Sequence, residues 1–140
     1  MVKLPFRSNP HSGKPGKGAT AENLACRYLS QQGLNIVERN YRTQRGEIDI
    51  IARDKNALVF VEVRLRSHPG FGGAAQSINP QKQARLISAA QHYLLKTGLT
   101  DAQPCRFDAI CMSTIDDNTL KTQPNNQQID WIRDAFRPEA

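Results

Sequence analysis

One stretch of the chain, GEIDIIARDKNALVFVEVRLR between Gly46 and Arg66, constrains the fold more than any other. Its two halves are rich in β-branched residues, and a short polar segment separates them, which predicts two strands joined by a tight turn. Carboxylates nevertheless interrupt both strands, at Glu47 and Asp49 in the first and at Glu62 in the second. A charge inside a buried strand is costly unless it is solvated, paired or used, so these acids need a physical explanation.

The register of this hairpin follows from its turn. We place Lys55-Asn56 in a two-residue turn, so that Asp54 faces Ala57. The same register brings Asp49 directly opposite Glu62. Because side chains alternate between the two faces of a strand, the register also sorts the hairpin into two faces of different character.

One predicted face is wholly apolar and should be fully covered. It holds Ile48, Ile50, Ala52, Val59, Val61, Val63 and Leu65. The other face is apolar near the turn and charged away from it. It holds Ile51, Leu58, Phe60 and Arg53, and then Glu47, Asp49, Glu62, Arg64 and Arg66. The acids therefore gather at one end of one face.

The opposed carboxylates of Asp49 and Glu62 have two readings. Like charges directly across a strand pair are destabilising, so such a pair raises one carboxyl pKa or recruits a cation. Hard divalent ions such as Mg²⁺ are held by one or two carboxylates together with water and phosphate oxygens. Alternatively, the face is half exposed and its charges balance locally, with Glu47 and Arg64 as a cross-strand ion pair. The residues alone leave both readings open.

The remaining elements follow from helix caps and hydrophobic periodicity. The expected elements are a helix capped by Thr20 and ended by Gly33, a strand over 34–42, the two hairpin strands, a helix with Asn79 as cap, Pro80 in its first position and Gly98 at its end, a strand over 105–112, and a strand or short helix over 129–136. The strand–helix–strand unit over 57–112 implies a parallel pair. We therefore expect an α/β fold, a mixed central sheet flanked by helices in the order α-β-β-β-α-β.

Glu22 is the acid of interest in the first helix. It shares one face with Ala25, Cys26 and Leu29, and that face should meet the core. Its position near the helix start has a second explanation, because the helix dipole favours acids in the first turn. Glu22 is therefore either a site residue or a dipole-stabilising acid.

Charge and composition limit the function classes. The 140 residues suit one domain, and the net charge is +6, of which residues 1–18 supply +4 without any acid. We expect a disordered basic tail over 1–18, either a solvated leader or an arm that binds phosphates, and a single domain over 19–140. No apolar run could span a membrane or act as a signal peptide. Three scattered cysteines without any CxxC favour a cytoplasmic protein and give no zinc spacing.

The motif Gly46-Glu47-Ile48-Asp49, followed by the segment from Phe60 to Arg66, resembles the PD-(D/E)XK nuclease signature. More closely, the chain resembles the bacterial YraN family over residues 19–136. Other residues that carry this resemblance are Glu22 with Ala25 and Leu29, Asn40-Tyr41-Arg42, Lys82, Arg106-Phe107-Asp108 and Asp134-Ala135-Phe136. The resemblance implies a restriction-endonuclease-like fold, similar to that of archaeal Holliday-junction resolvases, which work as dimers.

The resemblance also implies roles for single residues. Asp49 and Glu62 match the carboxylates that hold Mg²⁺ or Mn²⁺, and Glu22 matches an assisting helical acid. Arg64 stands where the signature has Lys; an arginine does not act as a base, but it can grip a phosphate or stabilise oxyanion charge. Lys82 either takes the place of that Lys in space or is a solvated lysine at a helix start.

These residues lead to competing functional hypotheses. The first is a Mg²⁺-dependent nuclease that hydrolyses phosphodiesters in DNA, with branched or damaged DNA as candidate substrates and a homodimer as a possible assembly. Lys82, Arg66 and Arg42 are then the expected nucleic-acid contacts. The alternative is a non-catalytic nucleic-acid-binding module on the same fold, which Arg64 and the basic tail favour. A third reading, an interaction protein with a structural acidic cluster, has only the modest charge of residues 19–140 in its favour.

Overall fold

The computed structural model describes residues 17–66, 78–99, 102–113 and 129–138. Its elements are α1 (Lys17–Gln31), β1 (Asn35–Arg42), β2 (Glu47–Asp54), β3 (Ala57–Arg66), α3 (Pro80–Thr97), β4 (Cys105–Ser113) and β5 (Ile129–Phe136). The expected element order is confirmed, and the last element is a strand. Of the tail expected over residues 1–18, residues 1–16 lie outside the described part, and the last two residues belong to α1.

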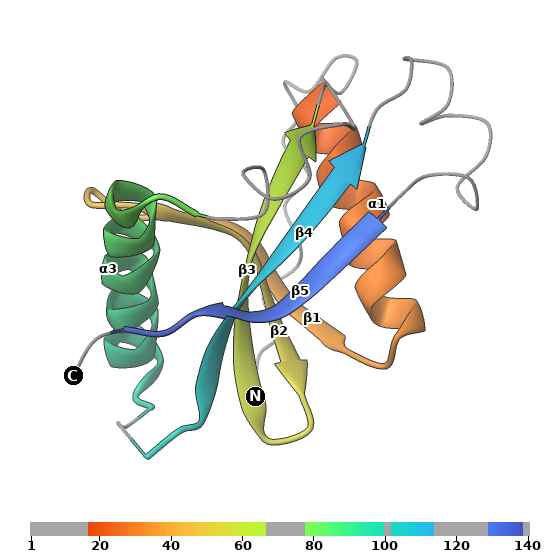
Figure 1. Cartoon of the computed structure of the whole chain (residues 1–140). Helices are drawn as coiled ribbons and strands as arrows, with labels where there is room; N and C mark the ends of the chain where they lie inside the picture. The colour runs from red at the N-terminus through yellow and green to blue at the C-terminus, as the bar shows by residue number, and fades with distance from the viewer. Residues whose placement is uncertain (1–16, 67–77, 100–101, 114–128, 139–140) are drawn as a thin grey trace, which may run out of the picture.

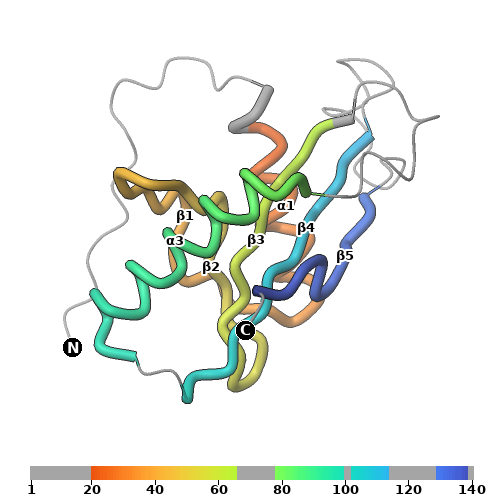
Figure 2. The backbone as a smooth tube through the Cα atoms, turned by 60° about the vertical axis from the view of Figure 1, so that its left-hand side comes forward, coloured from red at the N-terminus to blue at the C-terminus, as the bar shows by residue number. Residues whose placement is uncertain are grey.

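The five strands form one mixed sheet in the order β1-β2-β3-β4-β5. Strands β3 and β4 are parallel, as the strand–helix–strand unit predicts, and the other neighbours are antiparallel. The two described helices lie on opposite sides of the sheet (Figure 1), and the view in Figure 2 places α3 in front of β2 and β3. The α/β architecture with a mixed, helix-flanked sheet is therefore confirmed.

The hairpin has the predicted register near its turn. Asp54 pairs with Ala57, and the ladder continues to the pair Ile50–Val61. Lys55 adopts a left-handed conformation with φ 58°, as a two-residue hairpin turn requires. Pairing between β2 and β3 ends at this point, one residue before Asp49 would face Glu62. This early end of the ladder shapes the site described below.

Each face of the sheet has its own apolar core. The α1 side packs Ala25 and Leu29 against a group of strand residues: Ile50, Ala52, Val59, Val61, Ile110 and Met112. The α3 side packs Leu86, Ala89 and Tyr93 against a second group: Tyr41, Ile48, Ile51, Leu58, Phe60 and Phe107. Burying apolar surface on both faces is what holds a two-sided sheet between helices.

Two members of the predicted apolar face behave differently from expectation. Ile48 belongs to the α3-side core and not to the core that contains Ile50. The reason is that Ile48 pairs with Tyr41 of β1 beyond the end of the β2–β3 ladder, so the alternation is interrupted at Asp49. Leu65, expected to be covered, is 39% exposed near the end of β3.

The helix ends agree with prediction at three of four points. Asn79 caps α3 by accepting from the Lys82 backbone N–H, and Gly98 ends it in the left-handed region with φ 75°. Gly33, with φ 100°, follows the end of α1. The expected cap at Thr20 is wrong, since α1 begins three residues earlier at Lys17. No proline lies between Lys17 and Thr20, and the single glycine there reduces helix stability by only about 1 kcal/mol. Neither described helix is long and apolar enough to cross a membrane.

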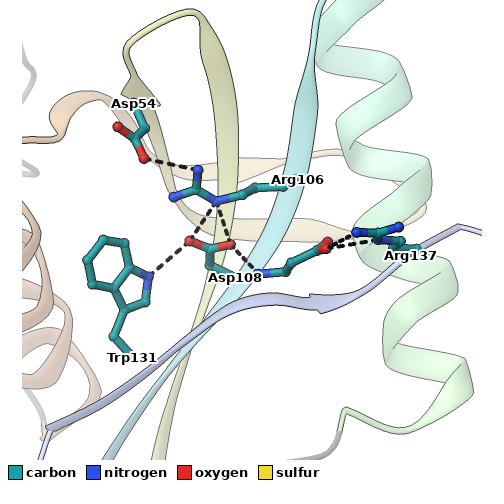
Figure 3. A network of polar contacts seen from close by, with 6 residues as sticks. Asp54, Arg106, Asp108, Trp131 and Arg137 are labelled. Carbon is teal, nitrogen blue, oxygen red and sulfur yellow. Dashed lines mark hydrogen bonds and ion pairs between the residues drawn. The ribbon is translucent and has the colours of Figure 1, made fainter.

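A buried carboxylate fastens β5 to the sheet (Figure 3). Asp108 accepts hydrogen bonds from Trp131 Nε1 at 2.9 Å, from the Asp134 backbone N–H at 2.9 Å and from Arg106 Nε at 3.0 Å. Arg106 also pairs with Asp54 Oδ2 at 3.0 Å, which ties the β2–β3 turn to β4. Because the Asp108 side chain is fully buried, this network is a structural one.

Candidate active site

Asp49 directly precedes the last paired residue of β2 in the β2–β3 ladder. Its side chain accepts a hydrogen bond from the β3 backbone, where a ladder would use a backbone carbonyl. Its Oδ2 accepts the Val63 backbone N–H at 2.8 Å. The pKa of Asp49 is raised to about 7: burial is the largest cause, the Val63 hydrogen bond opposes it, and the charge of Glu62 and a hydrogen bond with its side chain add to the rise. The structure therefore brings the side chains of Asp49 and Glu62 together, although the β2–β3 ladder ends before these two residues pair across the strands. Such a pair favours a bound proton or a bound cation.

Glu62 is the most deeply placed acid of the site, with a side chain only 5% exposed. Lys82 Nζ approaches its Oε2 to 2.5 Å, from the first turn of α3. The contact joins a half-exposed ammonium group to a buried carboxylate oxygen and neutralises its charge. Lys82 is thus not a merely solvated lysine at a helix start. It supplies a positive charge in contact with Glu62.

Glu62 and Lys82 open into a hollow of about 400 Å³ between the sheet and α3. Its lining combines the acidic residues Glu47 and Glu62 with a basic set. The basic set is Arg42, Arg45, Lys82 and Arg85. A cavity with one buried and one exposed carboxylate at its wall and cationic side chains around them suits a phosphate together with a divalent cation.

The connection between β1 and β2 forms one wall of this hollow. Thr43 fixes its shape, because its hydroxyl donates to the Gly46 carbonyl at 2.9 Å and accepts the Arg45 and Gly46 backbone N–H groups. Gly46 lies directly against α3, where an added Cβ would stand 2.1 Å from the Arg85 carbonyl oxygen. Only glycine allows the connection to lie this close to the helix backbone. Arg42 and Arg45 are thereby held beside the acids.

Glu22 reaches the site from the opposite helix. Burial raises its pKa, and a hydrogen bond with Asn40 and the charge of Arg39 oppose that rise. Arg39 Nη2 lies 3.8 Å from Glu22 Oε1. The charge of Glu22 contributes to the raised pKa of Asp49, so the two acids lie within electrostatic reach of each other. In the described part of the chain, no three His, Cys, Asp or Glu side chains are arranged to hold one metal ion.

The other predicted site residues have different surroundings. Glu47 pairs in the sheet with Arg42 of β1, which also lies 3.5 Å from its carboxylate, and its side chain is 64% exposed. Arg64 is half-buried and stands beside Cys111 of β4 in the parallel ladder. Arg66 ends β3, and its side chain lies outside what the structure describes. Of the expected nucleic-acid contacts, Lys82 and Arg42 therefore share the hollow with Glu62.

Sequence reasoning missed two basic residues of the hollow, Arg45 and Arg85. A signal for Arg85 exists, because it follows Lys82 by three positions and so shares a face of α3 with it. Arg45 precedes Gly46, yet nothing local indicates that this connection packs on a helix almost forty residues further along the chain. Its position could be known only from the tertiary structure.

Comparison with known proteins gives a consistent family assignment. The model of a family described as "Uncharacterised protein family UPF0102" matches residues 21–112. A UPF0102 protein of Nitrosococcus oceani is 48% identical over 89% of this chain and 94% of its own length. A UPF0102 protein of Janthinobacterium is also 48% identical, over 96% of this chain and 98% of its own length. The matched residues include Glu22, Asp49, Glu62 and Lys82.

Proposed function

The chain belongs to the uncharacterised protein family UPF0102, the YraN-like family that its motifs resemble, and we propose that it is a metal-dependent nuclease acting on DNA. The observation that carries the proposal is the contact of Asp49 with Glu62, an acid that lines a hollow rich in basic residues. Two carboxylates that share a partly buried site are unfavourable on their own. Their arrangement is understandable if a cation completes it.

The residues present fit a Mg²⁺ or Mn²⁺ ion. Asp49 and Glu62 would hold it, because hard divalent ions accept one or two protein carboxylates and fill their remaining positions with water and phosphate oxygens. The Oε2 of Glu62 is a buried anionic oxygen whose partner in the described part of the chain is the Lys82 ammonium group, so the site already attracts positive charge. When bound, such an ion lowers the pKa of a coordinated water and polarises the phosphoryl oxygens.

The basic residues have separate parts in this proposal. Lys82, half exposed and in contact with Glu62, would place an ammonium group beside the scissile phosphate. Arg42, Arg45 and Arg85 line the same hollow and would bind nonbridging phosphate oxygens, where a guanidinium can donate two parallel hydrogen bonds. Lys82 would thus supply in space the charge that the signature places at position 64, with Arg64 as a further cation on β3.

A second candidate is a non-catalytic nucleic-acid-binding module. The observation that favours it is the contact between Lys82 and Glu62. In this contact an ammonium group already neutralises one of the two acids, so a metal ion is not needed there. In that case the basic hollow would bind backbone phosphates without cutting them. The two candidates share a substrate class and differ in whether the acidic pair binds a metal.

Several finer expectations belong to the same proposal. A restriction-endonuclease-like fold related to that of archaeal resolvases is supported by the mixed sheet and by the placement of Asp49 and Glu62 on neighbouring strands. Branched or damaged DNA as substrate, a homodimer as assembly and a cytoplasmic location follow from the resemblance and from the cysteine pattern. They stay predictions.

The proposal is tested by cleavage assays on linear, flapped and four-way DNA with Mg²⁺ or Mn²⁺. The wild-type protein should cut at least one substrate, and Asp49→Asn and Glu62→Gln should abolish cutting. Glu38→Gln, which removes an exposed carboxylate from β1, is the matched control and should cut normally. Binding that persists in all proteins without any cleavage would favour the binding module. Absence of both cleavage and binding would remove both candidates.

A further inference from the structure

A second hollow lies beside the first, on α3 and the β1–β2 connection. It has a volume of about 620 Å³ and is lined by Arg42, Thr43, Gln44, Arg45, Ser88 and His92. The residues from Arg42 to Arg45 also line the first hollow, so the two hollows share one wall. That wall is the connection between β1 and β2, which therefore forms a ridge, residues 42–46, between the two cavities.

The ridge has a fixed shape and position. The Thr43 backbone N–H donates to the Gly46 carbonyl at 2.8 Å, and the Thr43 hydroxyl closes the same turn. The close approach of Gly46 to the Arg85 carbonyl holds the ridge against α3. A fixed backbone keeps the Cα positions of the two arginines in place, so that only their side chains are ordered when a ligand binds, which reduces the entropic cost of binding.

The far wall of the second hollow supplies hydrogen-bond donors from α3. Ser88 and His92 are four positions apart and so lie on one face of the helix. His92 Nδ1 makes a 2.5 Å hydrogen bond with the Tyr41 hydroxyl. Tyr41 is buried and held in the sheet, so this bond fixes the orientation of the exposed His92 ring. In the neutral ring that accepts at Nδ1, the proton is on Nε2, which is then a donor.

The charge around this hollow is positive. Among the described residues its lining contains Arg42 and Arg45 and no carboxylate, in contrast to the first hollow with Glu47 and Glu62. The described lining of the second hollow therefore suits an anion. Arginine guanidinium groups, a serine hydroxyl and an imidazole N–H are together typical contacts of a nucleic-acid backbone phosphate.

We propose that the hollow formed by Arg42, Arg45, Ser88 and His92 is a second phosphate subsite, which holds a backbone phosphate of the same polynucleotide whose other phosphate lies beside Glu62. This inference rests on the proposed function, because it assigns the first hollow to a nucleic acid. The polynucleotide backbone then crosses the ridge and is held on both sides of it. Because the contacts are to phosphate, the subsite contributes affinity irrespective of base sequence.

The test measures binding of fluorescein-labelled thymidine and adenosine oligodeoxynucleotides of about 20 residues by anisotropy, in EDTA so that nothing is cut. Ser88→Glu places a carboxylate in the second hollow, and Gln32→Glu makes the same charge change at an exposed residue directly after α1, across the sheet. We expect Ser88→Glu to weaken binding of both oligonucleotides about tenfold and to lower the salt slope by about one, while Gln32→Glu changes little.

A variant without a charge change separates direct contact from long-range repulsion. The double variant Ser88→Ala/His92→Gln removes both donors and should weaken binding several-fold, and its circular dichroism and melting curve should match those of the wild type. Its Mn²⁺ affinity, measured by calorimetry, should also be unchanged, because Glu62 lines the first hollow and neither Asp49 nor Glu62 lines the second.

Three other outcomes would overturn the subsite, and they differ in what they mean for the proposed nuclease function. If the wild type binds the oligonucleotides and both second-hollow variants bind equally well, the subsite is wrong and the nuclease proposal stands. If Ser88→Glu abolishes stabilisation by inorganic phosphate but leaves oligonucleotide binding intact, the hollow takes a free anion and the proposed ligand is wrong. If the wild type neither binds nor cuts nucleic acid, both the subsite and the proposed function are removed.

Discussion

Replacement of Asp49 by Asn should make the metal-free protein more stable at pH 8, although it removes a residue proposed for catalysis. Asparagine is nearly isosteric with aspartate, so its side-chain oxygen can still accept the Val63 backbone N–H. Its amide N–H₂ group can donate to Glu62, in the place of the proton that the acidic pair would otherwise bind. The substitution therefore removes a like-charge contact and keeps the hydrogen bonds.

The magnitude follows from the pKa of Asp49, which burial and then Glu62 raise from 3.8 to about 7, against the opposing Val63 hydrogen bond. Between these two values the folded protein holds a proton that the unfolded chain has lost. The wild type therefore loses stability as the pH rises from 3.8 through 7, at up to about 1.4 kcal/mol per pH unit. The total is on the order of 4 kcal/mol, and Asp49→Asn should recover much of it, about 2–3 kcal/mol.

The assay is urea unfolding in EDTA at pH 5, 6, 7 and 8, followed by circular dichroism for the wild type, Asp49→Asn and the surface control Glu38→Gln. The stability difference between Asp49→Asn and wild type should grow from pH 5 to pH 7 and then level off. The free energy of unfolding of the Glu38→Gln control should change with pH in the same way as that of the wild type. Added Mg²⁺ should stabilise the wild type by about 2.7 kcal/mol at one hundred times its Kd, and should not stabilise Asp49→Asn.

Parallel pH curves for wild type and Asp49→Asn would refute the reasoning, because they would mean that Asp49 is ionised as easily in the folded protein as in the unfolded chain. A large loss of stability in Asp49→Asn at every pH would also refute it. In that case the Asp49 carboxylate would stabilise the fold, as the Asp108 carboxylate does, whereas its raised pKa requires that it destabilise the metal-free protein.

Three further predictions test the surroundings of the site. Gly46→Ala should lower stability by about 1–3 kcal/mol in urea unfolding and should reduce cleavage, because the added Cβ would stand 2.1 Å from a backbone oxygen of α3. An unchanged midpoint of urea unfolding would mean that the ridge does not pack on the helix. Asp108→Ala should lower stability by about 3–5 kcal/mol, since it leaves buried donors without their acceptor, and the loss should appear in Trp131 fluorescence. Lys82→Gln should lower the stability of the metal-free protein, because it leaves the buried Glu62 carboxylate without its counter-charge, but should strengthen Mn²⁺ binding in calorimetry, because it removes a cation that competes for Glu62, while cleavage falls; weaker Mn²⁺ binding would contradict this.

The fold could largely be predicted from local sequence signals. The α3 boundaries follow from Asn79, Pro80 and Gly98, whose capping preferences depend on backbone geometry within a few residues. The hairpin register near Lys55 follows from alternation and turn length in the same way. Thr20 failed as a helix cap because a threonine is also tolerated inside a helix, so a weak local signal could not decide between two starts.

The proximity of Asp49 and Glu62 was also predictable, because the hairpin turn fixes which residues of two adjacent strands meet. What the sequence did not provide was the end of the β2–β3 ladder at Ile50. That end depends on Ile48 packing beside Tyr41 in the core under α3, which is a contact between three elements. It frees the Asp49 side chain to accept the Val63 N–H and to meet Glu62.

The sequence by itself therefore determined which strands and helices form, how the hairpin pairs and which two acids lie together. Only the tertiary structure decided that Lys82 contacts Glu62, that Arg45 and Arg85 share their hollow, and that a second hollow lies beyond the ridge. The physical reason is the distance along the chain over which each interaction acts. Turns, caps and alternation act over a few residues, whereas the docking of α3 on the sheet and on the ridge depends on packing between segments far apart in the chain.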